Sequence, residues 1–312
     1  MEARLVFAGT PGFAAVHLQA LLEHGAVPAA VYTQPDRRAG RGQHLQPSPV
    51  RQLAEAHGLE VRTPPDFADP REVERLAALR PQLLLAVAYG VLLPPAVLAI
   101  CPCVNVHASL LPELRGAAPI ARALLEGRTQ TGITLMRMAE RLDAGDMLLQ
   151  ETCPIRADDT AESLAQRLAG AGAQLLAGHL EDLLCGRLHG VPQDESRASY
   201  ARKLSKGEAP LDFTRTPAEL ERQVRGLIPW PVATFSAGGL NFKVFRARAR
   251  NEEHDLAPGT LAALTAEHLA VACRGGMLEI ELLQPPGRGP VKAGQYARGR
   301  PEVFSIGGVL GG

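Results

Sequence analysis

The strongest constraint in this sequence is the alternation, through its first half, of short apolar runs with longer amphipathic stretches. The short runs predict β-strands and the longer stretches predict α-helices. Because the strands alternate with helices, they are expected to pair in parallel within a layered α/β sheet. The run from Leu83 to Ala88 is apolar at every position, which is typical of a central strand covered on both faces. The predicted fold class is therefore α/β, with a doubly wound, mostly parallel sheet.

The periodicity predicts where each element of this first half lies. Helices are expected over residues 12–23, 49–57, 70–79, 116–125 and 161–184. Strands are expected over residues 4–8, 27–33, 60–62, 82–88, 104–107, 131–138 and 147–155.

The pattern changes after Gly186, which indicates a second domain. Residues 188–206 are polar and rich in turn formers, like a linker, and one more helix is expected over 217–226. Short strand-like runs punctuated by Gly and Pro then suggest a small β-barrel or sandwich. They cover residues 233–236, 242–247, 259–264, 269–273 and 277–283. The expected division is 1–188 for the first domain, 189–206 for the linker and 207–312 for the second domain.

Composition limits the class of protein. A chain of 312 residues fits two domains, and 33 basic residues against 33 acidic ones exclude a protein that is basic all over. Five cysteines, an odd number, argue against a disulfide framework, and Cys101–Cys103 has no second pair at zinc spacing, so no metal is expected. The apolar stretch 83–100 is interrupted by Gly90 and Pro94, which argues against a membrane span. With no secretory signal visible at the N-terminus, a cytoplasmic location is expected.

Two polar residues on one predicted strand are the sharpest chemical signal. Asn105 and His107 are two positions apart, so their side chains point to the same face of the strand, near the carboxyl edge of the sheet where α/β folds bind ligands. Asn can hold a developing oxyanion, and His can give or accept a proton near neutral pH. Satisfied polar groups in a core are the alternative interpretation, although a buried imidazole needs a partner.

The turn containing Asp143 and Asp146 offers that partner. It precedes a predicted strand, and one of its carboxylates is expected to orient His107 or stabilise its charge. A simple Asx-type turn remains the alternative. An Asn, His and Asp set suits direct transfer of an activated group to an amine without a covalent enzyme intermediate.

A turn and a loop are candidates for phosphate contacts. The segment Gly9–Gly12 follows the first strand and opens the first helix, where doubly wound sheets bind phosphates, but a tight structural turn explains it as well. Residues 33–51 form a long loop with four arginines against one aspartate, a net charge of 4 − 1 = +3. Such a loop is typical of phosphate binding, with a solvated surface loop as the alternative.

The C-terminal region carries a second basic feature. Lys243 precedes three arginines at alternate positions, Arg246, Arg248 and Arg250, which a strand places on one face. From Lys203 onward, 14 basic and 11 acidic residues give 14 − 11 = +3. This mild excess fits an auxiliary surface for a polyanion, or merely a solvated strand face.

These segments together resemble the methionyl-tRNA formyltransferase family, which belongs to the 10-formyltetrahydrofolate-dependent formyltransferases. The resemblance covers nearly the whole chain and weakens after about residue 285. It departs mildly at Ala108, where the family pattern has Gly, and at the Gly-rich end from 307 to 312. The matching blocks are residues 7–11, 33–37, 39–42, 47–50, 87–90, 105–112, 115–120, 142–147, 200–204 and 229–231.

The resemblance implies a Rossmann-like formyltransferase domain, a linker and a C-terminal OB-like barrel that binds tRNA. It implies transfer of formyl from 10-formyltetrahydrofolate to the α-amine of methionyl initiator tRNA, by a monomer that needs no metal. It also assigns the residues. The catalytic trio is Asn105, His107 and Asp143. Folate binding is expected at Val87, Ala88, Tyr89, Gly90, Val91, Leu92, Ser109, Leu110, Leu111, Pro112 and Asp143. Contacts to tRNA are expected at Thr10, Pro11, Arg37, Arg38, Arg41, Lys203, Lys206, Lys243, Arg246 and Arg248.

Three functions remain open at this point. The first is the tRNA formyltransferase. The second is a formyltransferase for a small amine, which shares the trio but does not need the arginine loop or the barrel. The third is a non-catalytic RNA-binding module, which leaves a buried Asn and His unexplained.

Overall fold

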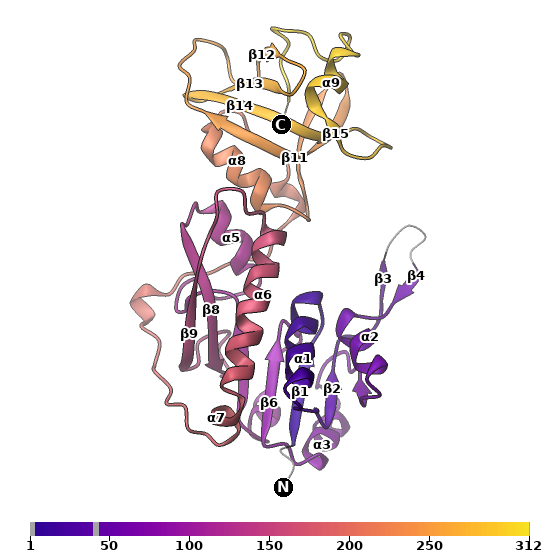
Figure 1. Cartoon of the computed structure of the whole chain (residues 1–312), viewed down its shortest axis with the longest axis vertical. Coiled ribbons are helices and arrows are strands. Elements are labelled where there is room, and N and C mark those ends of the chain that lie inside the picture. The colour runs from indigo at the N-terminus through magenta and orange to yellow at the C-terminus, as the bar shows by residue number, and fades with distance from the viewer. Residues whose placement is uncertain (1–3, 40–43, 312) are drawn as a thin grey trace. The chain divides into compact units, whose positions relative to one another are not determined.

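The chain packs as two compact units, seen in the computed structural model that describes residues 4–39 and 44–311 (Figure 1). Unit 1 consists of Met1–Pro119, Gln130–Pro154 and Ala165–Ala201, and unit 2 of Ile120–Thr129, Ile155–Leu164 and Arg202–Gly312. The segment expected to be a linker is divided between them, since residues up to Ala201 pack within unit 1. The boundaries at 188 and 206 stay a prediction.

Unit 1 is built on a seven-stranded sheet in the order β5-β2-β1-β6-β7-β8-β9. Pairing is parallel from β5 to β7 and antiparallel for β7–β8 and β8–β9. The doubly wound, mostly parallel sheet is thus confirmed. Its strands are β1 (Leu5–Gly9), β2 (Ala30–Tyr32), β5 (Val61–Arg62), β6 (Leu83–Val87), β7 (Cys103–His107), β8 (Gln130–Arg137) and β9 (Met147–Pro154).

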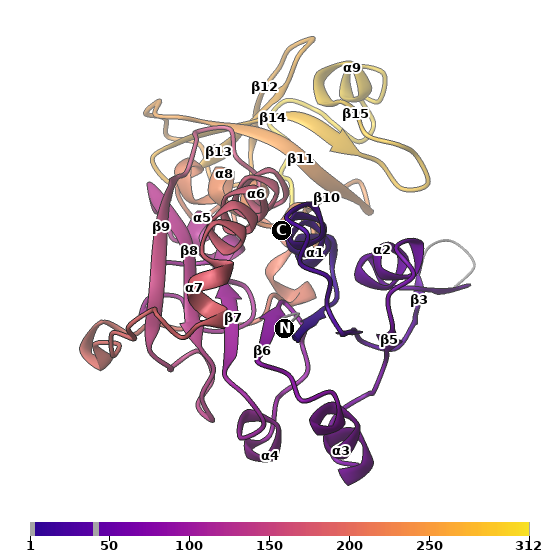
Figure 2. The same ribbon diagram turned by 60° about the horizontal axis from the view of Figure 1, so that its bottom comes forward.

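Helices cover both faces of this sheet. In Figure 2, α1 and α6 lie on one face and α3 and α4 on the other. Every residue of β6 is buried, as expected for a strand covered on both sides. The helices are α1 (Gly12–Glu23), α2 (Pro49–Ala56), α3 (Pro70–Ala78), α4 (Pro95–Leu98), α5 (Pro119–Leu125), α6 (Ala161–Gly178) and α7 (Leu180–Leu184), of which α5 and the start of α6 belong to unit 2.

Local sequence explains several of these boundaries. The Ser48 hydroxyl accepts the Arg51 N–H and so caps α2, and Asp69 caps α3 in the same way through the Arg71 N–H. Each cap is followed by proline, which suits the first helical position. The helix expected over 161–184 is two helices, because Gly178 ends α6 and His179 leaves the helical conformation.

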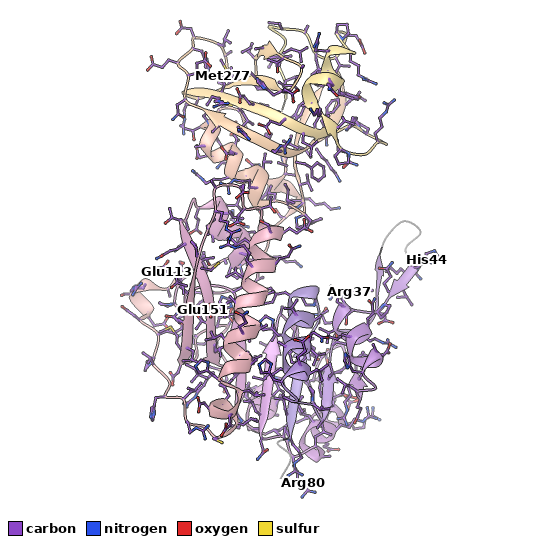
Figure 3. The ribbon with its side chains drawn as sticks, in the orientation of Figure 1. Arg37, His44, Arg80, Glu113, Glu151 and Met277 are labelled. Carbon is purple, nitrogen blue, oxygen red and sulfur yellow. The ribbon has the colours of Figure 1, made fainter. Side chains whose placement is uncertain are left out.

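The basic segment 33–51 contains more order than a loop. Strands β3 (Arg37–Ala39) and β4 (His44–Gln46) pair antiparallel as a hairpin, and Figure 3 shows Arg37 and His44 on its two strands. At its base the Arg51 guanidinium donates to both Asp36 oxygens at 3.0 Å and to Glu55 at 2.7 Å. The hairpin therefore begins from a fixed base. Arg41 lies outside the described residues.

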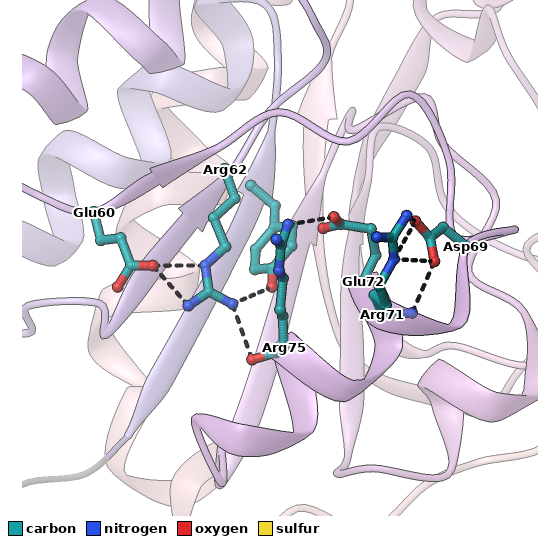
Figure 4. A network of polar contacts seen from close by, with 7 residues as sticks. Glu60, Arg62, Asp69, Arg71, Glu72 and Arg75 are labelled. Atoms are coloured by element: carbon teal, nitrogen blue, oxygen red, sulfur yellow. Dashed lines mark hydrogen bonds and ion pairs between the residues drawn. The ribbon is translucent and has the colours of Figure 1, made fainter.

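A chain of polar contacts joins β5 to α3 (Figure 4). Arg62 of β5 donates to the Tyr32 hydroxyl and to the Arg75 carbonyl, both at 2.9 Å, and pairs with Glu60 at 2.6 Å. Arg75 in turn pairs with Glu72 at 2.7 Å. Burial raises the pKa of Tyr32, so its hydroxyl stays protonated at neutral pH. This network fixes the edge strand β5 against its neighbour β2 and against α3.

Unit 2 is a curled antiparallel sheet in the order β10-β11-β14-β13-β12, with β15 paired to β14. Helix α8 begins with a capping box formed by Thr216 and Glu219. The core contains Phe235 and Phe242, which stack at 5.2 Å. The elements are α8 (Pro217–Gly226), β10 (Ala233–Ala237), β11 (Leu240–Arg250), β12 (Leu261–Leu264), β13 (Leu269–Cys273), β14 (Gly276–Gln284), β15 (Val291–Lys292) and α9 (Ala293–Arg298).

The Gly-rich end joins the two edges of this sheet. Gly311 pairs with Ser236 of β10, and Val309 pairs with Thr260 beside β12. Leu310, between them, is buried. A Cβ on Gly311 would come within 2.5 Å of the Ser236 hydroxyl, so only glycine fits there without a shift. The sheet is therefore joined edge to edge through this segment, which agrees with the predicted OB-like barrel.

Candidate active site

Strand β7 delivers Asn105 and His107 to the carboxyl edge of the parallel part of the sheet. Strands β1, β6 and β7 run in the same direction, so their carboxyl ends meet at this edge. Asn105 is partly exposed, whereas His107 is buried. As the i, i+2 spacing predicts, the two side chains share one face of β7.

His107 lies between a carbonyl and a carboxylate. Its Nε2 is 2.9 Å from the Leu114 carbonyl oxygen, and because that oxygen can only accept, Nε2 carries a proton and donates. Its Nδ1 is 3.6 Å from the Asp143 Oδ2 atom. A second proton on Nδ1 would make this contact an ion pair. The ring is thus oriented from both sides.

Asp143 is held in an unusual backbone conformation. Its φ is +50°, in the left-handed region that non-glycine residues seldom adopt. Its Oδ2 also accepts the Gly116 N–H at 2.8 Å. Two residues later, a Cβ on Gly145 would overlap the Arg137 carbonyl oxygen. The turn is therefore shaped to bring one carboxylate oxygen to the ring of His107.

The amide of Asn105 has no hydrogen-bond partner among the described residues. A partly exposed amide at the end of a parallel sheet is available to a ligand. Its NH2 group is a neutral donor, which suits an oxygen that gains negative charge during a reaction. The Asn–His–Asp arrangement therefore combines an available donor, an oriented imidazole and a carboxylate.

The predicted folate segment after β6 begins at this same edge. Val87 ends β6, and Ala86 is the register partner of Asn105. Ala88 and Gly90 both have positive φ, which turns the chain sharply. The whole set Val87, Ala88, Tyr89, Gly90, Val91 and Leu92 follows from that point, with Tyr89 buried and Leu92 exposed.

The predicted folate segment after β7 is fixed by Thr134. The Thr134 hydroxyl donates to the Ser109 carbonyl at 2.7 Å and accepts the Leu111 N–H at 3.1 Å. Gln150 donates to the Leu111 carbonyl at 2.9 Å. Leu110 lies over Gly132, where a Cβ would come within 2.5 Å of it, and Pro112 follows a cis peptide bond. Ala108, where the family pattern has Gly, does not have a positive φ, so an alanine fits there.

The turn after β1 joins the segment after β6. The Thr10 hydroxyl donates to the Tyr89 carbonyl at 2.9 Å, and the Gln34 side-chain amide donates to the same oxygen at 2.8 Å. Pro11 provides the carbonyl that accepts the first N–H groups of α1. Arg37 of the hairpin donates to the Gln34 side-chain oxygen. A continuous set of contacts therefore leads from the hairpin base to the predicted folate segment.

The predicted basic residues of unit 2 lie on its surface. Lys203 and Lys206 are exposed near a 3-10 turn, η2 (Lys206–Glu208). Lys243, Arg246 and Arg248 are exposed on β11, where strict alternation would have put Lys243 opposite the arginines. An irregularity in the register between Val244 and Ala247 shifts the alternation and brings all three to one face. Glu281 partly neutralises them, since it pairs with Arg246 at 2.6 Å and with Arg248 at 2.8 Å.

Several groups around the trio could not be identified from sequence. The Leu114 carbonyl and the Gly116 N–H act through the backbone, so their side chains give no signal. Gln193 donates to the Asp143 carbonyl at 2.8 Å from 50 residues away in the chain. Arg115 lies in the matching block 115–120, and its side chain is fully buried. Because a buried charge requires partners, the burial of Arg115 identifies it, in the structure, as part of the polar network around the trio.

Two other kinds of feature are absent from the described part of the chain. No helix there is long and apolar enough to cross a membrane. No group of three or more His, Cys, Asp or Glu side chains there is arranged to hold a metal ion.

Two family models match the chain. One, described as formyl transferase, matches residues 3–180, and one described as formyl transferase, C-terminal domain, matches residues 203–301. Curated relatives named methionyl-tRNA formyltransferase match along nearly the full length. The relative from Methylococcus capsulatus is 50% identical over 94% of this chain and 96% of its own. The relative from Pseudomonas paraeruginosa is 48% identical over 99% of each chain.

Solved structures with low sequence identity share the fold. An N-formyltransferase from Helicobacter canadensis, solved with folinic acid and dTDP-3-aminofucose, is 18% identical, covers 91% of this chain and 99% of its own, and has a TM-score of 0.68. A sugar N-formyltransferase from a Shewanella species is also 18% identical, covers 81% of this chain and 100% of its own, and has a TM-score of 0.62. Together with the matches above, these similarities show that the chain belongs to the formyl transferase family, alongside the methionyl-tRNA formyltransferases.

Proposed function

We propose that this protein is a transferase that moves the formyl group of 10-formyltetrahydrofolate to the α-amine of methionyl initiator tRNA. Identity of 47–50% to methionyl-tRNA formyltransferases over at least 94% of the chain supports the substrate pair. The observation that carries the chemistry is a buried imidazole, oriented by Leu114 and Asp143, beside the available amide of Asn105. The product is the formylmethionyl-tRNA that starts translation.

The proposed reaction is a direct transfer. The amine nitrogen attacks the formyl carbon, a new C–N bond forms, and the bond from that carbon to N10 of the folate breaks. The amine loses one proton and N10 gains one, so the products are the formylated amine and tetrahydrofolate. Asn105 would donate to the oxyanion of the tetrahedral intermediate. His107 would move the proton or donate to that oxyanion, and Asp143 would stabilise its charged form.

The two substrates would approach from different elements. The folate would bind along Val87–Leu92 and Ser109–Pro112, which both start from the carboxyl edge of the sheet beside Asp143. The aminoacyl end of the tRNA would lie at Thr10 and Pro11. Its phosphates would contact the basic residues Arg37, Arg38, Arg41, Lys203, Lys206, Lys243, Arg246 and Arg248.

The proposed function also leads to expectations about location, oligomeric state and domain division. Because the proposed tRNA substrate belongs to the translation machinery, we expect the enzyme in the cytoplasm. We expect a monomer divided into a catalytic domain (1–188), a linker (189–206) and a tRNA-binding domain (207–312). Analytical ultracentrifugation tests whether the protein is a monomer, and limited proteolysis tests the domain boundaries.

A direct assay tests the function. Purified protein is incubated with methionyl-tRNA and formyl-labelled 10-formyltetrahydrofolate, and label on the α-amine is measured. We expect transfer that depends on the folate and that collapses by at least about 100-fold in His107→Ala. The exposed His57 at the end of α2 provides a matched control, and His57→Ala is expected to keep wild-type activity. Label on a small amine but not on methionyl-tRNA would contradict the proposed substrate, and full activity of His107→Ala would contradict the assigned role.

A further inference from the structure

The segment from Gln193 to Ala201, which ends unit 1 just before the last stretch of unit 2, packs against the candidate active site. The Gln193 side-chain nitrogen donates to the Asp143 carbonyl at 2.8 Å and to the Gly145 carbonyl at 2.7 Å. These carbonyls flank the turn that carries the Asp143 carboxylate. Because Asp143 has a positive φ, which a non-glycine residue adopts at a cost, the turn needs support from outside itself.

Gln193 is itself oriented by a buried charge. Its side-chain oxygen accepts from Arg115 Nε at 3.0 Å and from Arg115 Nη2 at 2.8 Å. Since the guanidinium only donates and the two carbonyls only accept, the amide can be placed in only one of its two orientations. Arg115 also pairs with Glu195 at 2.9 Å, and Glu195 pairs with Arg141 at 3.0 Å. Hydrogen bonds from Arg115 and Arg141 lower the pKa of Glu195 to about 2, so it is ionised at neutral pH.

The far end of the same segment supports His107. The Ser199 hydroxyl accepts the Leu114 N–H at 2.9 Å, and the Ser199 carbonyl accepts the Arg115 N–H at 2.9 Å. Ala201 pairs with the Arg115 carbonyl through its N–H at 2.7 Å. Leu114 then holds the His107 ring through its own carbonyl. One segment therefore fixes the two groups that orient His107, namely the Asp143 turn and the Leu114 carbonyl.

We propose that Gln193 is a positioning residue for formyl transfer and that residues 193–201 form part of the catalytic centre. This inference rests on the proposed function. Gln193 does not touch the reacting atoms, and it acts by holding the Asp143 carboxylate at its distance from His107. Displacing a catalytic group by about 1 Å is enough to slow a reaction by about 100-fold.

Two substitutions separate this role from a role in satisfying Arg115. Gln193→Leu removes both sets of hydrogen bonds. Gln193→Glu keeps a strong acceptor for Arg115 but replaces the donor to Asp143 and Gly145 with a carboxylate oxygen. We expect kcat to fall by about 100-fold in both variants, with smaller changes in KM for either substrate. The melting temperature should also fall in Gln193→Leu, because this change leaves the buried Arg115 without one of its acceptors, so activity is measured well below that temperature. Gln19→Leu, on the surface of α1, is the matched control and is expected to keep wild-type kcat.

A readout that needs no activity completes the test. We expect the NMR signals of the His107 ring to shift in Gln193→Leu and Gln193→Glu, while those of the exposed His57 stay unchanged. Wild-type kcat in Gln193→Glu would show that Gln193 serves only Arg115 and would overturn the inference, as would an unchanged His107 signal in both variants. A wild-type protein without formyl transfer would instead refute the proposed function, and the NMR shift would still decide whether Gln193 positions the site.

Discussion

Two Arg–Glu clusters of the molecule differ in their burial, and the buried cluster fixes the geometry of the candidate site. In unit 1, Arg115 has no exposed side-chain surface and donates to both Gln193 and Glu195. In unit 2, Arg246 and Arg248 are more than 60% exposed and share Glu281. Exposed pairs contribute little because water and salt compete with them, whereas a buried guanidinium must be fully partnered. The difference shows that the first region is built for position and the second for net charge.

The largest expected effect is on the chemistry that the buried region supports. Asn105→Ala should lower kcat by about 1,000-fold, because it removes the neutral donor to the oxyanion. Single-turnover formyl transfer measures this step directly. A fall of less than about tenfold, with the fold intact, would mean that Asn105 is not the oxyanion donor.

His17 is a second buried side chain that can carry a positive charge. It shows how burial without a full set of hydrogen-bond partners affects the stability of the fold. Its Nδ1 donates to the Phe13 carbonyl at 2.8 Å, but its Nε2 has no hydrogen-bond partner within the described residues. Burial lowers the pKa of His17 from 6.5 to about 4. The unfolded chain therefore takes up the proton first, so this contribution to stability is complete above pH 6.5 and is lost as the pH falls towards about 4. The full loss amounts to about 3 kcal/mol, at about 1.4 kcal/mol per pKa unit.

Urea unfolding at pH 7.5 and pH 4.5 measures the effect of His17. His17→Leu should lose clearly less stability between these two pH values than the wild type does. His24 provides a matched control, since its Nδ1 makes the same contact to Ala20 at 2.8 Å but its side chain is exposed. An equal pH dependence in His17→Leu and His24→Leu would contradict the assignment.

The comparison between the two arginine regions can be tested with one matched pair. Arg115→Met should lower the free energy of unfolding by about 2 kcal/mol, because it leaves the acceptor oxygen of Gln193 without its partner. Arg246→Met should change it by no more than about 0.5 kcal/mol. Chemical denaturation of both variants measures these values, and similar losses would show that burial does not distinguish the two regions.

The smallest expected effect concerns the net charge of β11. Lys243 has no ion-pair partner within residues 4–39 and 44–311, whereas Arg248 is paired with Glu281. If the basic face of β11 (Lys243, Arg246 and Arg248) contacts tRNA phosphates, Lys243→Ala should reduce the slope of log binding constant against log salt concentration by about 1. Arg248→Ala should reduce it by less. A titration of tRNA binding at several salt concentrations measures both slopes. Unchanged slopes in both variants would show that this face of β11 does not contact tRNA.

The sequence predicts the elements whose signals are local. The apolar run of β6 and the i, i+2 spacing of Asn105 and His107 identify the central strand and the edge of the sheet that carries the candidate site. The turn with two carboxylates also predicts Asp143 as a partner of His107, which the 3.6 Å contact between them supports. Gln193 bonds to the Asp143 carbonyl from 50 residues further along the chain, and local pattern contains no information about it. The β3–β4 hairpin could not be predicted from the sequence because its residues lack apolar alternation. The register irregularity in β11 could not be predicted either, and it changes which side chains share a face.

The pairing of Ser236 with Gly311 has a consequence for the order of events during synthesis. The two residues are 75 positions apart (311 − 236), so the Ser236 end of β10 is made long before its partner. Thr234, two residues earlier, already has a partner on this edge, in the preceding segment 209–211. At about 5–20 residues per second, a ribosome needs about 4–15 s to reach Gly311. Unpaired strand edges favour association with other chains during that interval. The Ser236 end of β10 is therefore exposed to such association until Gly311 emerges, and substitutions at Gly311 would prolong that exposure.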